Sequence, residues 1–411
     1  MLDVLAYTLL GIGLGVFTGL VPGIHVNNLT PMLVALALSS SLPPMCLAAM
    51  IVAMSLVNTF ISYIPSTFLG APEEGTELSV LPAHRLLLEG HGYEAVKLTT
   101  FGCLASLMLS AVLIWPLLLV ITPAYGLIQP HMHWLLIAVV AIMIALERSK
   151  AGILWAVAIF FLSGLLGLLT LDTNLCGGDA ALMPLLSGLF GISVLLPSVF
   201  SKSGLPKQQI DDKPIEIRPN IRPLCAGTAA GVLTGVIPGI GPSQGTVLAQ
   251  LVTRSKGSRE FLVAVSGVNT SKALLSFVAI YAIGRPRSGA AVAVGQVMEV
   301  GLRELIFLVG IALFAGGIAA ILQLQLGKLA AKHIGRMPYR ATCLAVMASI
   351  VGLTIWYSGL IGLPILATAT AIGLLPAVTK VKRTHCMGVI MLPCILYFAG
   401  LSGAVVSALG L

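Results

Sequence analysis

Charged residues are scarce in this sequence. Asp, Glu, Lys and Arg together account for 9% of the 411 residues, whereas 57% are hydrophobic. With a mean hydropathy of +1.02, this composition excludes an ordinary soluble domain. The chain is therefore predicted to be an all-α polytopic protein of the cell membrane, a multi-pass protein surrounded by the lipid bilayer.

Acidic residues are fewer than basic ones, which leaves a net charge of +8. In a soluble chain this charge would suggest nucleic acid, but here the basic residues cluster in short loops between apolar segments. Such a pattern indicates how the protein is oriented in the membrane and does not indicate a nucleic-acid partner. No Lys or Arg precedes the first apolar segment, so we expect it to be a retained membrane helix rather than a cleaved signal.

Paired cysteines are also lacking. The seven cysteines are odd in number and form no C-x-x-C motif, so neither a disulfide framework nor a zinc site is indicated. We expect no cofactor and no resident metal, apart from a coupling Na⁺ or H⁺.

The sequence instead contains one phrase twice. Residues 15–24 read GVFTGLVPGI and residues 231–240 read GVLTGVIPGI, with seven of the ten positions identical. In each copy an apolar run reaches a Pro-Gly pair, where the loss of a backbone donor and the freedom of glycine should break the helix. Within a bilayer, the freed backbone groups are tolerated only inside protein or beside a watery cavity. Two broken helices in corresponding places are typical of a transporter binding site.

Hydropathy predicts seven apolar segments in each half. Segments 24–38 and 241–252 are shorter than the ~20 residues that a spanning helix needs, so each should form a re-entrant hairpin with the segment before it. That leaves about ten full crossings. The segments are 4–21, 24–38, 43–66, 98–121, 132–146, 151–171, 180–200, 224–238, 241–252, 260–283, 301–326, 341–358, 360–379 and 386–409.

Further matches follow the phrase in the same order in both halves. Residues 55–59 match 266–270 in a Ser-x-Val-Asn-Thr pattern, residues 70–75 match 284–289 in Gly-x-Pro-x-x-Gly, and 195–199 match 374–378 in Leu-Leu-Pro-x-Val. We therefore predict one transmembrane domain, 1–411, with a repeat at 1–200, a linker at 201–223 and a second repeat at 224–411.

Parity and charge predict the topology. Five full crossings per half, an odd number, require the two repeats to be inverted relative to each other. With the linker in the cytoplasm, all but four of the 23 Lys and Arg residues lie on the cytoplasmic side, a strong positive-inside bias. The four exceptions lie in the second half: Lys272, Arg285, Arg287 and Arg303.

The helix starts that follow the two breaks are candidate anion sites, because free N–H groups and the positive end of the helix dipole favour a carboxylate or phosphate. The alternative is that their polar side chains only cap the broken backbone. The candidate substrate-binding residues are Pro22, Gly23, His25, Asn27 and Asn28 in the first half and Pro238, Gly239, Ser243 and Gln244 in the second.

Two Asn-Thr pairs within apolar segments are candidates for the coupling ion. Asn58 and Thr59 in one half and Asn269, Thr270 and Ser271 in the other supply carbonyl and hydroxyl oxygens, which hard cations prefer. Interhelical hydrogen bonding is the alternative role for such side chains.

Three cations of the second half are candidates for holding an anionic substrate. Lys272 comes one residue after the polar cluster, and an intramembrane ammonium must face a partner or a cavity. Arg285 and Arg287 flank Pro286 in a tight turn, where they would attract anions or contact lipid headgroups. A charged stretch between Glu73 and Glu94 would relay protons if buried, although a cytoplasmic loop would keep it solvated.

The double G-x-x-x-G-x-x-P-G motif, with LLEGHGYEA at residues 87–95, resembles the large membrane subunit of the tripartite tricarboxylate transporters (TctA), in particular its shorter, stand-alone archaeal-type branch. The resemblance implies cation-driven uptake of citrate-like carboxylates with a small membrane subunit and an extracytoplasmic binding protein. It also implies substrate and ion contacts at the two Pro-Gly pairs. The family's Pro-Glu-x-x-Asn motif is replaced in the second half by residues 268–272 and 285–289.

The sequence thus predicts a secondary active transporter for an organic anion, a carboxylate, driven by a Na⁺ or H⁺ gradient through alternating access. A polyprenyl-phosphate translocase is the alternative, because a phosphate-headed lipid would suit the same cations. An intramembrane serine hydrolase is a remote third, since residues 241–245 fit G-x-S-x-G without the strand-to-helix turn that this motif needs. We expect that the protein is not an enzyme. A second copy of the chain is a further expected partner, in a homodimer.

Overall fold

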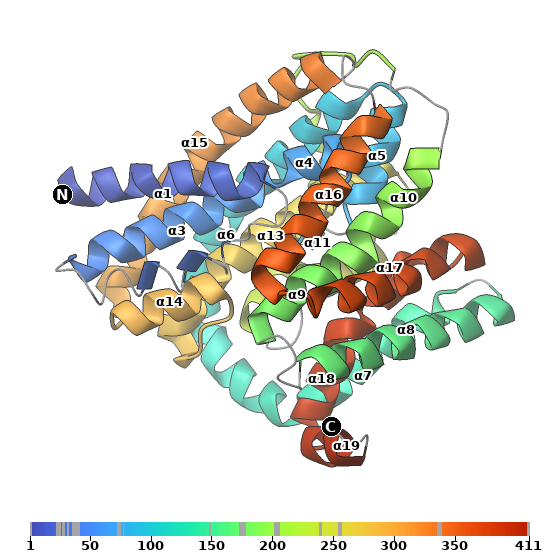
Figure 1. Cartoon of the computed structure of the whole chain (residues 1–411). Coiled ribbons are helices and arrows are strands. Elements are labelled where there is room, and N and C mark those ends of the chain that lie inside the picture. The colour runs from blue at the N-terminus through green and yellow to red at the C-terminus, as the bar shows by residue number, and fades with distance from the viewer. Residues whose placement is uncertain are drawn as a thin grey trace.

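The computed structural model describes residues 2–21, 26, 29–30, 33–34, 42–71, 75–76, 78–147, 149–171, 178–200, 206–237, 241–253, 257–334 and 339–408. These residues are largely helical and include no strand, as predicted (Figure 1). The first half contains α1 (Leu2–Leu20), α3 (Pro44–Ile61), α4 (Tyr63–Phe68), α5 (Val80–Leu88), α6 (Gly92–Ile128), η1 (Gln129–His131), α7 (Met132–Ala145), α8 (Lys150–Leu171), α9 (Gly178–Leu186), η2 (Ser187–Ile192) and α10 (Ser193–Phe200).

The second half contains a similar series of helices. They are α11 (Ile217–Val236), α12 (Pro242–Thr253), α13 (Ser258–Ile283), α14 (Gly289–Val297), α15 (Leu302–Ile334), α16 (Tyr339–Ser358), α17 (Gly362–Thr379), η3 (Arg383–Met387), α18 (Gly388–Phe398) and α19 (Ser402–Ala408).

Eight of the described segments are long and apolar enough to cross a membrane, by length and composition. The protein is therefore a multi-pass membrane protein. Gly92–Ala145 alone, at 54 residues, has length for two crossings, so the expected number of about ten remains a prediction. The eight segments are Leu2–Leu20, Pro44–Phe68, Gly92–Ala145, Lys150–Leu171, Ala180–Pro197, Ser258–Ile283, Leu302–Ile334 and Gly362–Thr379.

Several helix boundaries differ from the hydropathy prediction. Helix α11 begins at Ile217, inside the predicted linker, because its charged and proline-rich start escapes a search for apolar runs. Helices α5 and α14, both short, lie in stretches that were expected to be loops. The long α6 contains Pro116 and Pro123 and still continues to Ile128, since apolar packing outweighs the loss of two backbone donors.

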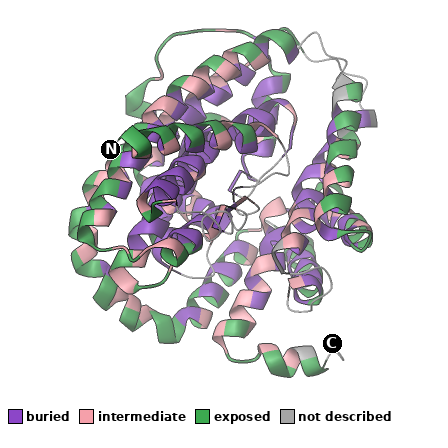
Figure 2. Ribbon diagram, turned by 60° about the vertical axis from the view of Figure 1, so that its left-hand side comes forward, coloured by how far each residue is buried: buried purple, intermediate pink, exposed green. Residues whose placement is uncertain are grey.

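The helices form two packed bodies, each with its own hydrophobic core. The first body consists of α1, α3 to α6, α11 and α13 to α15. The second body consists of α7 to α10 and α16 to α19, with η2 and η3. Figure 2 shows the buried residues of each group of helices turned inward and the exposed ones on the outer faces. Both bodies draw helices from both halves of the sequence.

The cores of the two bodies meet at a few residues of the first body and of α12, the helix between α11 and α13. Ala71 packs with α10, α16 and α17, while Leu78, Ile237 and Val247 belong to the core of the second body. These residues lie beside the Gly-x-Pro-x-x-Gly stretch of the first half and the Pro-Gly break of the second. Helix α12 also packs against both α11 and η3. Ala71 and Ile237, which are next to these stretches in the sequence, therefore lie where the cores of the bodies meet.

Corresponding helices of the two halves pack reciprocally. Helix α1 packs on α3 as α11 packs on α13, and α15 packs on α3 as α6 packs on α13. In the second body, α8 packs on α18 as α17 packs on η2. The matched Leu-Leu-Pro sequences lie on α10 and α17, and their correspondence stays a prediction.

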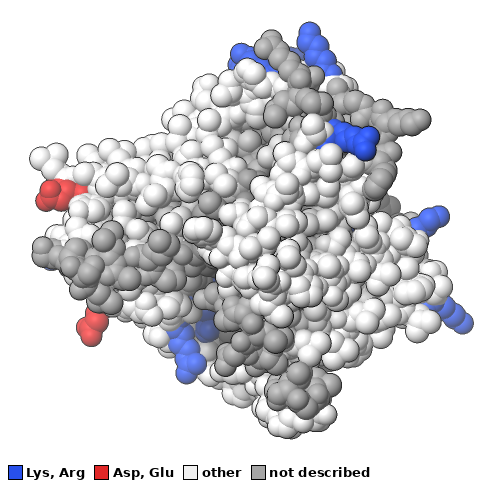
Figure 3. Space-filling view, viewed as in Figure 1, with Lys and Arg blue, Asp and Glu red and all other residues white. Residues whose placement is uncertain are grey.

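Charged side chains are few on the face shown in Figure 3. In this space-filling view, Lys and Arg atoms lie along the upper and right-hand edges, and the Asp and Glu atoms that are visible lie on the left. A further group of basic atoms lies below the centre of this face.

Candidate substrate and ion site

The two Asn-Thr pairs meet in the middle of the first body. Thr59 Oγ1 of α3 lies 3.3 Å from Thr270 Oγ1 of α13, and both residues are buried. The Cys103 thiol of α6 links the same two helices, because it donates to Thr59 O of α3 (3.6 Å) and to Ser266 O of α13 (3.8 Å). Corresponding threonines of the two halves therefore touch each other at the centre of the protein.

Glycines of the repeated phrase let the helices approach so closely. A methyl group on Gly15 would lie 2.7 Å from Met54 O and from Val57 Cβ, and one on Gly231 would lie 2.6 Å from Val268 O and Ser271 Cβ. Small residues are the usual means of close helix packing in membranes. Each phrase therefore places its helix directly on the Asn-Thr helix of its own half.

Asn58 of α3 forms a hydrogen bond to α1, the helix that contains the first copy of the repeated phrase. Its Nδ2 donates to Thr18 Oγ1 at 3.2 Å, and the side chain is buried. Asn58 thus has the interhelical role that sequence reasoning kept as the alternative to ion binding.

Asn269 differs from Asn58. The residue is 6% exposed, and its amide makes no hydrogen bond within the described part of the chain. Gly75 of the first half lies directly against this amide, because a methyl group on Gly75 would overlap with Asn269 Oδ1. An amide in this position offers both an oxygen acceptor and an N–H donor to a ligand.

The remaining polar residues of this cluster have different surroundings. Ser271 Oγ accepts a hydrogen bond from Ser110 Oγ at 2.8 Å, so it links α13 to α6. Lys272 is partly buried, and its backbone packs against Gly235 of the second phrase.

After the second break, Gln244 caps its own helix. Its Oε1 accepts from the Gly241 N–H at 2.8 Å, as a glutamine at the third helical position often does. Ser243 is 3% exposed at the start of α12, in a helix-break-helix context and not in a nucleophile elbow. Helix α12 folds back on α11, since a methyl group on Gly245 would lie 2.7 Å from Thr234 Cγ2.

The two arginines of the α13–α14 turn are placed differently. Arg285 is exposed, whereas Arg287 is partly buried with its guanidinium 5.0 Å from the ring centroid of Tyr125. The Nε and Nη2 atoms of Arg287 are buried and make no hydrogen bond with the described residues. A guanidinium with two unused buried donors is suited to bind the oxygens of an anion.

Several predicted site residues lie outside the described residues: Pro22, Gly23, His25, Asn27, Asn28, Pro238 and Gly239. Their assignment to substrate binding stays a prediction.

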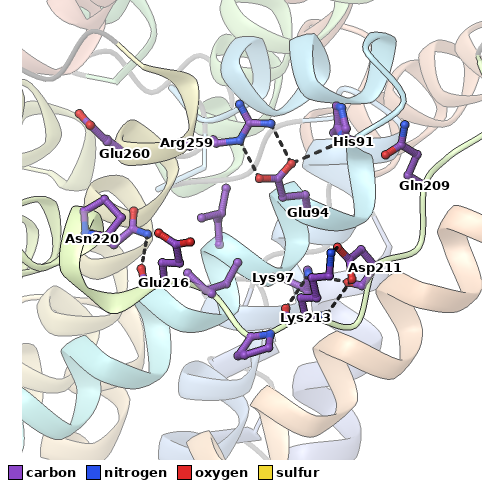
Figure 4. Close-up of a pocket in the computed structure, with 14 residues that line it drawn as sticks. His91, Glu94, Lys97, Gln209, Asp211, Lys213, Glu216, Asn220, Arg259 and Glu260 are labelled. Carbon is purple, nitrogen blue, oxygen red and sulfur yellow. Dashed lines mark hydrogen bonds and ion pairs between the residues drawn. The ribbon is translucent and has the colours of Figure 1, made fainter.

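A cavity of about 420 Å³ lies at the ends of α6, α11 and α13, under the extended chain between the halves (Figure 4). In it Arg259 donates to Glu94 through Nε (2.6 Å) and Nη2 (2.9 Å). Lys97 holds the linker by donating to Asp211 O and Lys213 O. Glu94 is thus used in an ion pair that joins the two halves, while Glu73 lies outside the described residues.

Sequence reasoning missed a buried acid and histidine in the second body. His385 Nε2 of η3 lies 2.9 Å from Glu147 Oε1, and the two side chains are 1% and 9% exposed. The same carboxylate oxygen accepts from the Lys382 N–H at 3.0 Å. No sequence pattern singles out these two residues, and only tertiary packing shows that they meet.

Burial lowers the pKa of His385 below its ordinary value of 6.5, although the Glu147 carboxylate opposes this shift. The unfolded chain then binds a proton that the folded protein resists, so stability should fall as the pH drops below about 6.5, by at most about 1.4 kcal/mol per pH unit. We expect the melting temperature in detergent to decrease between pH 7.5 and 5.5, and to change less in His385→Gln. Equal pH profiles for both proteins would contradict this assignment.

Among the described residues, no group of three or more His, Cys, Asp or Glu side chains is arranged to hold a metal ion. The polar centre is instead built from amide and hydroxyl groups of the two Asn-Thr helices, enclosed by the repeated phrases. A comparison with protein families finds that residues 5–388 match the model of the tripartite tricarboxylate transporter TctA family. The chain belongs to this family.

A relative of this TctA-family protein is an uncharacterized protein of Methanocaldococcus jannaschii. The two are 29% identical over 407 residues, which is 96% of this chain and 98% of that protein. This similarity agrees with the expected stand-alone archaeal-type branch. No solved structure matches the chain.

Proposed function

We propose that this TctA-family protein is a secondary active transporter of an organic anion, a carboxylate, driven by a Na⁺ or H⁺ gradient. The observation that carries the proposal is the Asn269 amide, which belongs to a residue only 6% exposed in the first body and lies against Gly75. Its oxygen can accept from, or coordinate, a ligand, and its N–H groups can donate to one. A bound cation or substrate oxygen would use these groups.

Alternating access is supported by the division into two bodies. Their cores meet at Ala71 and Ile237, which are next to the interrupted segments in the sequence, so movement of one body against the other would open these segments to one side and then the other. The reciprocal packing of α3 and α13 is what a two-fold axis between inverted repeats would produce. We therefore propose inverted repeats with broken-helix hairpins as the basis of transport.

Reconstituted uptake tests this proposal. Purified protein in liposomes should take up citrate-like acids when a Na⁺ or H⁺ gradient is applied, and Asn269→Ala should lose most of this uptake. A matched control is Asn220→Ala, which removes a buried amide whose Nδ2 only donates to Glu216 O at 2.8 Å. The proposal fails if wild-type protein moves no organic anion under either gradient.

We further propose that Arg287 contacts the anion at the mouth between α13 and α14. Arg287→Gln should raise the KM for the anion by about tenfold, since a charge-assisted hydrogen bond contributes about 1.5–3 kcal/mol. Arg285→Gln, which changes the exposed neighbour, is the control and should have a smaller effect. An unchanged KM in Arg287→Gln would show that Arg287 does not contact the anion.

A lipid phosphate is the second candidate substrate, favoured by two apolar grooves. They flank the first half of α15, with volumes of about 740 and 570 Å³, and share Leu302, Ile306 and Gly310. Neither groove contains a residue of the Asn-Thr centre, so the soluble carboxylate fits the site better. Transport of a polyprenyl phosphate without carboxylate uptake would reverse this preference.

We also propose that the protein works with partner subunits, because the family forms a tripartite system. Uptake by the reconstituted chain alone, compared with uptake after addition of a membrane subunit and a binding protein, measures this dependence.

A further inference from the structure

A second guanidinium, that of Arg383, lies partly buried in the turn between α17 and α18. Its Nη1 donates to Ser193 Oγ at 2.8 Å. Ser193 is fully buried and gives its own proton to Leu189 O at 2.6 Å, so its oxygen is fixed as an acceptor. Ser193 directly follows the π-helical turn η2, a type of distortion that often accompanies functional sites. The protein thus holds Arg383 in one position.

No described carboxylate forms an ion pair with Arg383. Glu147, the acid attached to this turn, is occupied by His385 and by the Lys382 N–H. Burial lowers the pKa of Arg383 below its ordinary value. A cation that is withdrawn from water without a counter-charge is unfavourable. An anion that arrives from outside would supply the missing charge.

The position of Arg383 suits a substrate that passes between the bodies. Its segment, η3, packs against α12, the helix that follows the second Pro-Gly break. Two residues after Ser193, Leu195 contacts Gly70 of the first body. Lys380 and Lys382 precede Arg383 in the same turn, which the charge distribution assigns to the cytoplasmic side.

We propose that Arg383, fixed by Ser193, binds the oxyanion group of the substrate, a carboxylate or a phosphate, on the cytoplasmic side of the path. The planar guanidinium matches two oxygens of such a group. Arg287, a partly buried guanidinium of the first body, is the corresponding contact that we propose at the other mouth. The inference rests on the proposed transport function, although its first test below does not require transport.

Chemical modification tests the binding directly. Phenylglyoxal, which reacts with arginine side chains, is applied to the purified protein in detergent, and the modified residues are identified by mass spectrometry. Citrate or inorganic phosphate should slow modification of Arg383 at least about fivefold, while the exposed Arg218 reacts at the same rate in all samples. Protection by polyprenyl phosphate in mixed micelles, and by neither soluble anion, would assign the oxyanion to a lipid. Unchanged reaction of Arg383 with all three probes would overturn the proposal.

Measuring transport from each side of the membrane distinguishes substrate binding by Arg383 from a purely structural role. In liposomes of known orientation, Arg383→Gln should raise the KM measured from the cytoplasmic side about tenfold and leave the KM from the other side unchanged. Arg383→Lys, which keeps the charge, should recover part of the loss, and Arg218→Gln is the control. An equal effect on both sides, or none on either, refutes the assigned contact. Absence of uptake by the wild type would refute the proposed function alone, because protection of Arg383 is measured without transport.

Discussion

Replacing Gly75 with alanine is expected to reduce organic-anion uptake by about tenfold or more, equivalent to about 1.4 kcal/mol or more. The new methyl group would overlap with Asn269 Oδ1, at the amide that we propose as the ligand-binding group. Gly75 also has a φ of +90°, a conformation that a residue with a side chain adopts only under strain. Uptake into liposomes and the melting temperature should be measured on the same preparation.

A second glycine distinguishes the effect of backbone strain from the effect of a methyl group that blocks the Asn269 amide. Gly359 has a φ of +65°, and no atom lies within 4 Å of a methyl group placed on it. Gly359→Ala should therefore lower stability slightly and leave uptake unchanged. If Gly75→Ala loses no more uptake than Gly359→Ala, the cluster around Asn269 is not the transport site.

The largest loss of stability is expected at the crossing of α8 and α18. A methyl group on Gly167 would overlap with Val389 O, and one on Gly388 would overlap with Phe160 O. Because backbone atoms leave no room, the two helices must separate, and overpacking of this kind costs about 1–3 kcal/mol or more. Gly167→Ala should therefore melt at a clearly lower temperature than the wild type in the same detergent.

Gly352→Ala is the matched control for this prediction. Gly352 lies in α16, and a methyl group there meets no atom within 4 Å. Its melting temperature should stay close to that of the wild type. Similar melting temperatures for both variants would mean that α8 and α18 do not cross as closely as described.

The sequence was informative where chemistry repeats along the chain. The doubled phrase predicted that Gly15 and Gly231 have the same function, and both place a helix on an Asn-Thr pair. The polarity of Asn269 and Thr270 within an apolar segment predicted their place in the interior, because such groups are unfavourable against lipid. The all-helical membrane fold followed from hydropathy alone.

The sequence was less informative where one residue meets another from a distant segment. The sequence patterns did not single out Arg383, Glu147 or His385, yet His385 and Glu147 are buried together. The division into two bodies was also absent from the prediction, because each body takes helices from both halves. Gln244, which is predicted to bind substrate, also caps α12 by accepting from the Gly241 N–H, a contact that the sequence alone did not specify.

The sequence by itself therefore determined the membrane fold, the duplication and the polar residues of the centre, since each follows from composition, periodicity or repetition. Only the tertiary structure decided which polar groups satisfy one another and which are left for a ligand. Asn58 is paired with Thr18, whereas the equivalent Asn269 is not paired within the described residues. The physical reason is that hydrogen bonding depends on the contacts between helices that are distant in the chain, and the two halves make those contacts differently.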